Sequence, residues 1–495
     1  MRGATDLQGR LSTLRTLLWG LLATSPCLFA GVVFAEPGAW SDPFNTSGSF
    51  SRTAAKEMLR PVDVAQDCQL TPPTGTIDLL TAVEHALCNN PKTRQAWNEV
   101  KFKAAQLGSA VSAFAPTVAG TVRQSSNKTS SEVQDTPQLS SEQRSSFRDY
   151  TLELSWKLID FGARQAQAEY ARQSLLAAQA THDDTLQSVF ATTVRDYYAG
   201  VAARSALEAA LGTEDDARRS LQAAKARVQG GIAPIIDQLQ AQTDYAQAVF
   251  NRAKVGGESR VLIGVLAVDM GLPPNHPLML PSLPDGIQLD SGLERPVNAL
   301  IDEARQLHPK TLAARAQLLA AQARISSARA LGLPSVSFTA RLSTSTQPVI
   351  PAVGLPGLAA TGRDRFVGLQ LNVPIFEGFA RTYEVSAARA TLEGQEANLR
   401  DIEQQVTLNV WTTFTTLETD AENVRNTDVL LDSARQSFVA AQQRYQKGVG
   451  SIIELLTAQT SLANARQRRV QSLLDWRTAR LQLAASLGQL SLLGL

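Results

Sequence analysis

The chain has 495 residues, a net charge of +1 at pH 7 and 6% aromatic residues. This length exceeds what one ordinary core holds, so it favours several domains or an extended shape. The near-neutral charge gives no support for a nucleic-acid partner, which usually requires a clearly basic face.

The N-terminus is typical of a secretory signal peptide. Basic residues precede apolar runs, and small residues stand at the −3 and −1 positions of a cleavage site after Ala35. A membrane anchor is the alternative, which Pro26 disfavours because it interrupts short apolar stretches. We predict a signal peptide over 1–35 and an N-terminal periplasmic arm over 36–77.

Two cysteines remain after this cleavage, Cys68 and Cys88. An exported protein meets an oxidising compartment, where two such cysteines can form a disulfide. The alternative is a pair of reduced, buried thiols.

An internal duplication organises the rest of the chain. Residues 227–243 (RVQGGIAPIIDQLQAQT) and 444–460 (RYQKGVGSIIELLTAQT) match in one register, 217 positions apart. Self-similarity over such a distance is the signature of a repeated unit. It defines repeat 1 over 78–271, a linker rich in proline and glycine over 272–296, and repeat 2 over 297–495.

Each repeat is expected to open with a helix of about 35 residues and to continue with two strands. The helices cover 78–113 and 297–331 and end before Pro116 and Pro334, because proline cannot continue a helix. Apolar and polar residues then alternate with the period of two that strands require. The strands are expected at about 117–125, 148–160, 335–343 and 365–375.

Long helices follow the strands, over 163–229 and 380–447, and neither contains a proline. Apolar residues spaced by four and three predict coiled-coil packing over a length of about 100 Å. Gly231 and Gly448 then allow a tight reversal of the backbone, after which a second helix runs back.

The mature chain contains no other apolar stretch of helical spanning length, so strands would have to cross any membrane. Four strands cannot close on themselves. Two chains would supply eight strands, whose interior side chains fill, whereas three would supply twelve around an open lumen. The strand count therefore predicts a homotrimer if the protein is a conduit.

The duplicated order of helix, two strands, long helix, glycine turn and helix resembles the TolC family of outer-membrane channels. The two turn motifs and LNVPIFEGFAR (371–381) carry this resemblance, and residues 68–97 resemble the type I secretion components that export large RTX toxins, such as the cyclolysin exporter. The resemblance implies a mainly α fold with a transmembrane β part: a trimeric 12-stranded β-barrel in the outer membrane, continued by a long periplasmic α-helical barrel. It also implies a periplasmic adaptor, an inner-membrane ABC transporter, contact with outer-membrane lipid and an unfolded polypeptide substrate.

The resemblance also implies a periplasmic gate. Tyr445 and Asp237 match a tyrosine and an aspartate that bond to each other in the family, and Glu454 matches the first of its acidic rings. Gly450 stands where the family has an arginine, and Arg444 is the nearby candidate to replace it. The alternative for both acidic residues is local, because a carboxylate in the first turn of a helix is favoured by the helix dipole.

Competing functions are an enzyme, a soluble periplasmic scaffold and a multidrug efflux channel. The four histidines are far apart and no catalytic or metal motif occurs, so we expect no enzyme, metal or cofactor. A scaffold explains the helices but not the alternating strands. An efflux channel would use the same tube, so it stays open as the alternative to secretion.

Overall fold

The computed structural model describes residues 42–46, 73, 75–132, 134–135, 141–281, 295–349 and 358–488. The chain divides into two units, Met1–Asn45 and Thr46–Leu495. The described part of the first is a turn in which the Asn45 amide donates to the Asp42 carbonyl at 3.1 Å. The expected signal peptide, most of the expected N-terminal arm and Cys68 lie outside the described residues.

The opening helix of each repeat is broken, which corrects the prediction of one helix of about 35 residues. Repeat 1 has α3 (Leu79–Asn89) and α4 (Pro91–Ser112), and repeat 2 has α7 (Val297–Leu307) and α8 (Pro309–Ala330). A residue before proline avoids the helical region, so the residue between each pair of helices is extended. Each of these residues also caps the following helix.

The four strands form one antiparallel sheet in the order β1-β2-β3-β4. They are longer than the alternation predicted: β1 is Thr117–Ser131, β2 Ser141–Ile159, β3 Ser335–Val349 and β4 Leu358–Asn372. The hairpins extend into the stretches between the expected strands, because ladder pairing continues to Ser131 and Ser141 in the first hairpin and to Val349 and Leu358 in the second.

The two faces of this sheet differ in polarity. Directly paired residues lie on the same face, and the register puts most large apolar side chains together. This face carries Val118, Val122, Tyr150, Leu152, Leu154, Trp156, Phe338, Leu342, Val367, Leu369 and Leu371. The opposite face carries hydroxyl and charged groups, including the Glu153–Arg341 ion pair at 3.2 Å.

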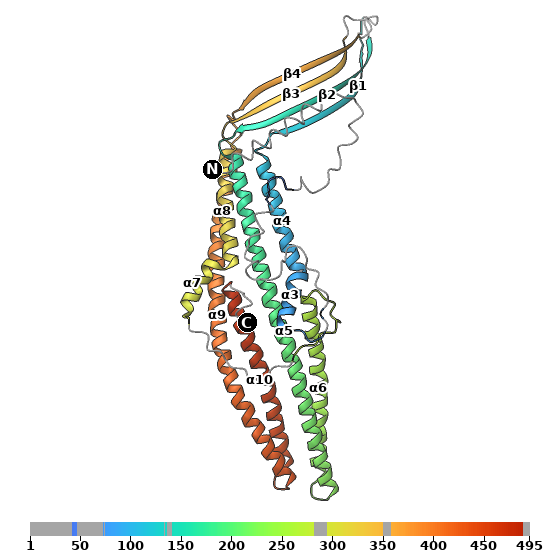
Figure 1. The fold of residues 1–495 in the computed structure, drawn as a ribbon, viewed down its shortest axis with the longest axis vertical. Coiled ribbons are helices and arrows are strands. Elements are labelled where there is room, and N and C mark those ends of the chain that lie inside the picture. Colours follow the sequence, from blue (N-terminus) through green and yellow to red (C-terminus); the bar gives the residue numbers. More distant parts are fainter. Residues whose placement is uncertain are drawn as a thin grey trace. The chain divides into compact units, whose positions relative to one another are not determined.

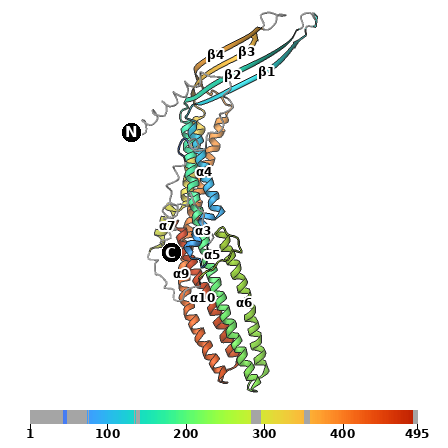
Figure 2. The ribbon, with the colours of Figure 1, turned by 45° about the vertical axis from the view of Figure 1, so that its right-hand side comes forward.

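The long helices have the predicted extents. Helices α5 (Ala163–Gln229) and α9 (Ala380–Gln446) contain 67 residues each, and α6 (Ile235–Asp269) and α10 (Ile452–Ser486) contain 35 each. Within the unit 46–495, the α5–α6 and α9–α10 turns lie at the end of the helices that is remote from the sheet (Figures 1 and 2). Small buried residues, mostly alanine, let the helices approach closely there.

Arginine side chains fix the transition from strand to long helix in both repeats. In repeat 1 the Arg164 guanidinium pairs with Asp160 at 2.8 Å and donates to the Ala113 carbonyl at 3.3 Å. In repeat 2, Arg381 pairs with Glu377 at 3.1 Å. These contacts hold the sheet at the start of α5 and α9. None of the described helices is long and apolar enough to cross a membrane.

Candidate functional site

The two turns of the helical part meet at Tyr445. This side chain is 1% exposed, and its hydroxyl donates to Asp237 Oδ2 over a distance of 3.4 Å. Burial raises the pKa of Tyr445, and the nearby Asp237 carboxylate raises it further against the positive charge of Arg227. The phenol therefore stays protonated and keeps its role as donor to Asp237. The structure thus brings together two of the three predicted gate residues.

Arg227 is a site residue that the sequence did not reveal. Its guanidinium carbon lies 4.4 Å from the centre of the Tyr445 ring, and its Nη1 donates to the Tyr445 carbonyl at 2.7 Å. A cation over an aromatic face contributes about 0.5–2 kcal/mol. The repeat offered a signal, because Arg227 and Arg444 occupy matching positions. Arg227 thereby joins the first repeat to the second at the turns.

Glu454 lies apart from this contact. Its amide donates to Ser451 Oγ at 3.1 Å, the N-cap of α10, and its carboxylate pairs with Arg444 Nε at 3.1 Å. Within the described chain Arg444 therefore forms an ion pair with Glu454, and it does not replace the family's arginine beside Asp237. Gly450 leaves little room for a larger residue, because an added Cβ would lie 3.0 Å from Arg444 Cβ.

The turn glycines adopt the left-handed conformation expected of them, with φ of 72° at Gly231 and 82° at Gly448.

Cys88 in α3 is a disulfide-bonded cysteine. Its predicted partner Cys68 lies outside the described residues, so the pairing of these two stays a prediction.

If the chain forms the conduit that the family resemblance implies, neutralising both acidic residues, with Asp237→Asn and Glu454→Gln, should raise its conductance in a planar bilayer or weaken its block by multivalent cations. The first change weakens the acceptor of Tyr445 and the second releases Arg444. Glu422→Gln, at an exposed position of α9, is the control. Unchanged conductance together with unchanged block would contradict a role in gating.

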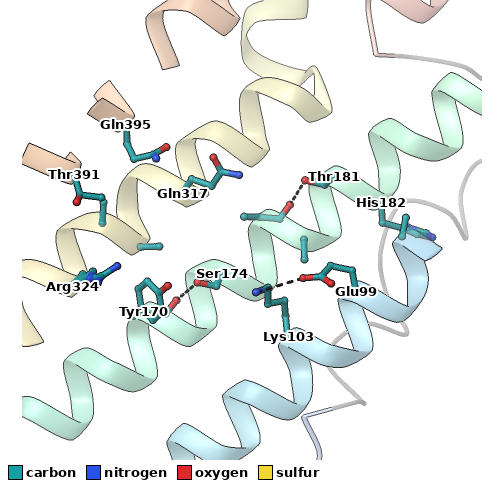
Figure 3. Close-up of a pocket in the computed structure, with 15 residues that line it drawn as sticks. Glu99, Lys103, Tyr170, Ser174, Thr181, His182, Gln317, Arg324, Thr391 and Gln395 are labelled. Atoms are coloured by element: carbon teal, nitrogen blue, oxygen red, sulfur yellow. Dashed lines mark hydrogen bonds and ion pairs between the residues drawn. The ribbon is translucent and has the colours of Figure 1, made fainter. Parts of the chain in front are cut away.

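A cavity of about 410 Å³ lies in the helical part between α4, α5, α8 and α9, away from the turns (Figure 3). Its lining is partly polar and includes the Glu99–Lys103 ion pair at 3.5 Å. Gln395 Oε1 is buried there without a hydrogen-bond partner among the described residues. A polar cavity of this size has room and partners for ordered water.

Two carboxyl groups, Asp196 on α5 and Asp269 on α6, lie together near Asn90, the N-cap of α4. Burial raises the pKa of Asp269 to about 7, and the hydrogen bond with Asp196 and its charge act in the same direction against Arg195 and Lys92. The matching positions of repeat 2 carry hydroxyls, Thr413 and Ser486, with oxygens 3.2 Å apart. Repeat 1 alone therefore has a titrating group at this place.

This pair predicts a pH dependence of stability. The folded chain binds the Asp269 proton more tightly than the unfolded chain, so the free energy of unfolding should fall as the pH rises from 3.8 to about 7. Asp269→Asn should reduce the difference between melting temperatures measured at about pH 5 and about pH 8. Asp401→Asn, at an exposed position of α9, should leave that difference unchanged. An identical difference in both variants would contradict the assignment.

Comparison with known proteins identifies the family of this chain. The model of the family described as "Outer membrane efflux protein" matches residues 82–258 and 300–489. Protein CyaE of Bordetella pertussis is 31% identical over 85% of this chain and 86% of its own. The solvent efflux pump outer membrane protein SrpC of Pseudomonas putida is 25% identical over 68% of this chain and 69% of its own. The crystal structure of the outer membrane protein VceC from Vibrio cholerae superposes with a TM-score of 0.69 at 20% identity, covering 83% of this chain and 96% of that one.

The sheet, the paired long helices and the meeting of their turns give the chain the fold of TolC-like outer-membrane channels. The chain belongs to the outer membrane efflux protein family. It is accordingly a transport protein of the outer membrane, and its helical part lies in the periplasm. Members of this family are outer-membrane channels rather than enzymes.

Proposed function

We propose that three copies of this chain form a channel through which a type I secretion system exports an unfolded polypeptide of the RTX type. The observation that supports the channel is the two-faced sheet. Its apolar face suits lipid and its polar face suits a water-filled lumen, which is the alternation of a membrane-spanning strand.

The number of copies follows from the edges of this sheet. Strands β1 and β4 each have a neighbour on one side only among the described residues. An unpaired edge in lipid costs several kcal/mol for each exposed backbone group, so strands of further copies must complete the ladder. Three copies supply twelve strands, which leave an open lumen, whereas eight would be filled by side chains.

The helical part continues this lumen in the periplasm. Helices α5 and α9, each with 67 residues, are long enough to reach about 100 Å from the sheet. The turns at their far ends are where an adaptor and an inner-membrane ABC transporter would engage. A channel closed there by the Tyr445 contact would open when these partners bind.

The secretion role draws its support from the 31% identity with Protein CyaE, which extends over 85% of this chain. The resemblance of residues 68–97 to RTX exporters supports the same role. A multidrug efflux channel is the second candidate, and it is favoured by the 25% identity with SrpC over 68% of the chain.

A secretion assay tests this proposal. The chain is expressed in a strain that makes an RTX toxin, its ABC transporter and its adaptor but lacks the outer-membrane component. We expect toxin in the medium, and none when residues 1–35 are deleted, because that chain would not be exported. Toxin retained in the cell, with solvent tolerance restored in a pump strain that lacks its own outer-membrane component, would favour efflux instead.

A further inference from the structure

A buried glutamine joins the two repeats above the turns. Gln459 of α10 is 3% exposed. Its Oε1 accepts a hydrogen bond from Ser220 Oγ of α5 at 2.9 Å, and its Nε2 donates to Asp244 Oδ2 of α6. One side chain of the second repeat is therefore held by both helices of the first. We call this arrangement the glutamine clamp.

The 217-residue repeat places a second set of clamp residues elsewhere on the chain. Gln242 of α6 matches Gln459, Ser437 of α9 matches Ser220, and Ser461 of α10 matches Asp244. All three counterparts are exposed, whereas Gln459 and Ser220 are buried.

An apolar residue on the face of α10 that carries Gln459 is likewise buried, whereas its counterpart on α6 is exposed. Ile452 at the start of α10 is 4% exposed, and its counterpart Ile235 on α6 is 59% exposed. Helix α6 thus presents the surface with which α10 packs on α5, but nothing in the described chain covers it. Burying such an apolar side chain removes it from water and is favourable, so a covering partner is favoured.

We infer that α6 of one copy docks against α9 and α10 of a second copy, with Gln242 between Ser437 and Ser461. The partner surface on the second copy is the counterpart of the α5–α6 surface that already receives α10 within the chain. The inference rests on the proposed assembly of several copies and assigns the residues at which they meet.

This seam between copies carries fewer charges than the contact within one chain. Asp216 and Arg466 form an ion pair at 3.1 Å within the chain, and their counterparts are Ser433 and Val249. The aspartate of the glutamine clamp is likewise replaced by a serine. Hydrogen bonds to charged groups are stronger than bonds between neutral groups. We therefore expect the contact between copies to be weaker than the contact of α10 with α5 and α6 within one chain.

Paired cysteines test the seam. In the full-length protein, Gln242→Cys with Ser437→Cys should form disulfides between copies, seen as covalent dimers and trimers that a reductant dissolves. The matched control, Ser220→Cys with Gln459→Cys, should cross-link only within a chain and keep the mass of one chain. Each single variant should give no covalent oligomer beyond that of the unmodified protein.

The outcomes separate the seam from the assembly. No covalent oligomer from the seam pair, while the control pair cross-links and the native mass is that of three copies, would overturn the inference and leave the trimeric channel standing. A native mass of one copy for both pairs and for the unmodified protein would overturn the inference together with the proposed function.

Discussion

Replacing Tyr445 by alanine is expected to open the periplasmic end of the channel and to give the largest rise in conductance of any single substitution at the turns. The change removes a fully buried ring, its hydroxyl bond to Asp237 and the surface on which Arg227 rests. Loss of a buried aromatic side chain costs about 3–5 kcal/mol. The contact between the turns should therefore be lost, with single-channel conductance in a planar bilayer as the measurement.

A graded control separates the hydroxyl from the ring. Tyr445→Phe keeps the ring under Arg227 and removes only the donor to Asp237, so its conductance should lie between those of the unmodified protein and the alanine variant. An alanine variant with unchanged conductance would show that Tyr445 does not hold the turns together.

Gly271→Ala is expected to cause the largest loss of stability among the glycine positions with positive φ. Gly271 has a φ of 75°, and an added Cβ would lie 2.7 Å from Asn89 Cβ and 3.1 Å from Asn89 O. The left-handed conformation costs a residue with a side chain about 1–2 kcal/mol, and overpacking adds about 1–3 kcal/mol. Thermal melting followed by helical circular dichroism measures the effect.

Gly231→Ala is the matched control for this substitution. Gly231 has nearly the same φ of 72°, but nothing lies within 4 Å of an added Cβ. This variant should lose only the conformational part, so its melting temperature should fall less than that of Gly271→Ala. Equal losses would mean that the contact with Asn89 does not matter.

The long helices were predictable from the sequence because their signals are local. A run without proline, bounded by a glycine in the left-handed region, fixes where α5 and α9 end. The breaks at Pro91 and Pro309 follow from an equally local rule, but the prediction of one continuous helix did not apply it.

The lengths of the strands were underestimated for a physical reason. The distal halves of β1 and β3 are rich in serine, threonine and glutamine, and such polar residues also suit loops. The backbone remains in the ladder there because each hairpin strand supplies the hydrogen bonds of the other. This pairing is a property of the sheet rather than of the residues themselves.

The candidate gate was partly predictable. The contact between Tyr445 and Asp237 was expected from the family resemblance. The cation over the Tyr445 ring and the pairing of Arg444 with Glu454 depend on how two distant turns meet, so no pattern within one turn indicates them. The glutamine clamp has the same origin, because Ser220 and Gln459 are brought together by the packing of α10 on α5.

Native mass spectrometry of the protein extracted from outer membranes in mild detergent tests the central claim most directly. The account predicts one species with three times the mass of the mature chain, which supplies the twelve strands of an open channel. A species of one or two copies would contradict it, because four or eight strands leave no open lumen.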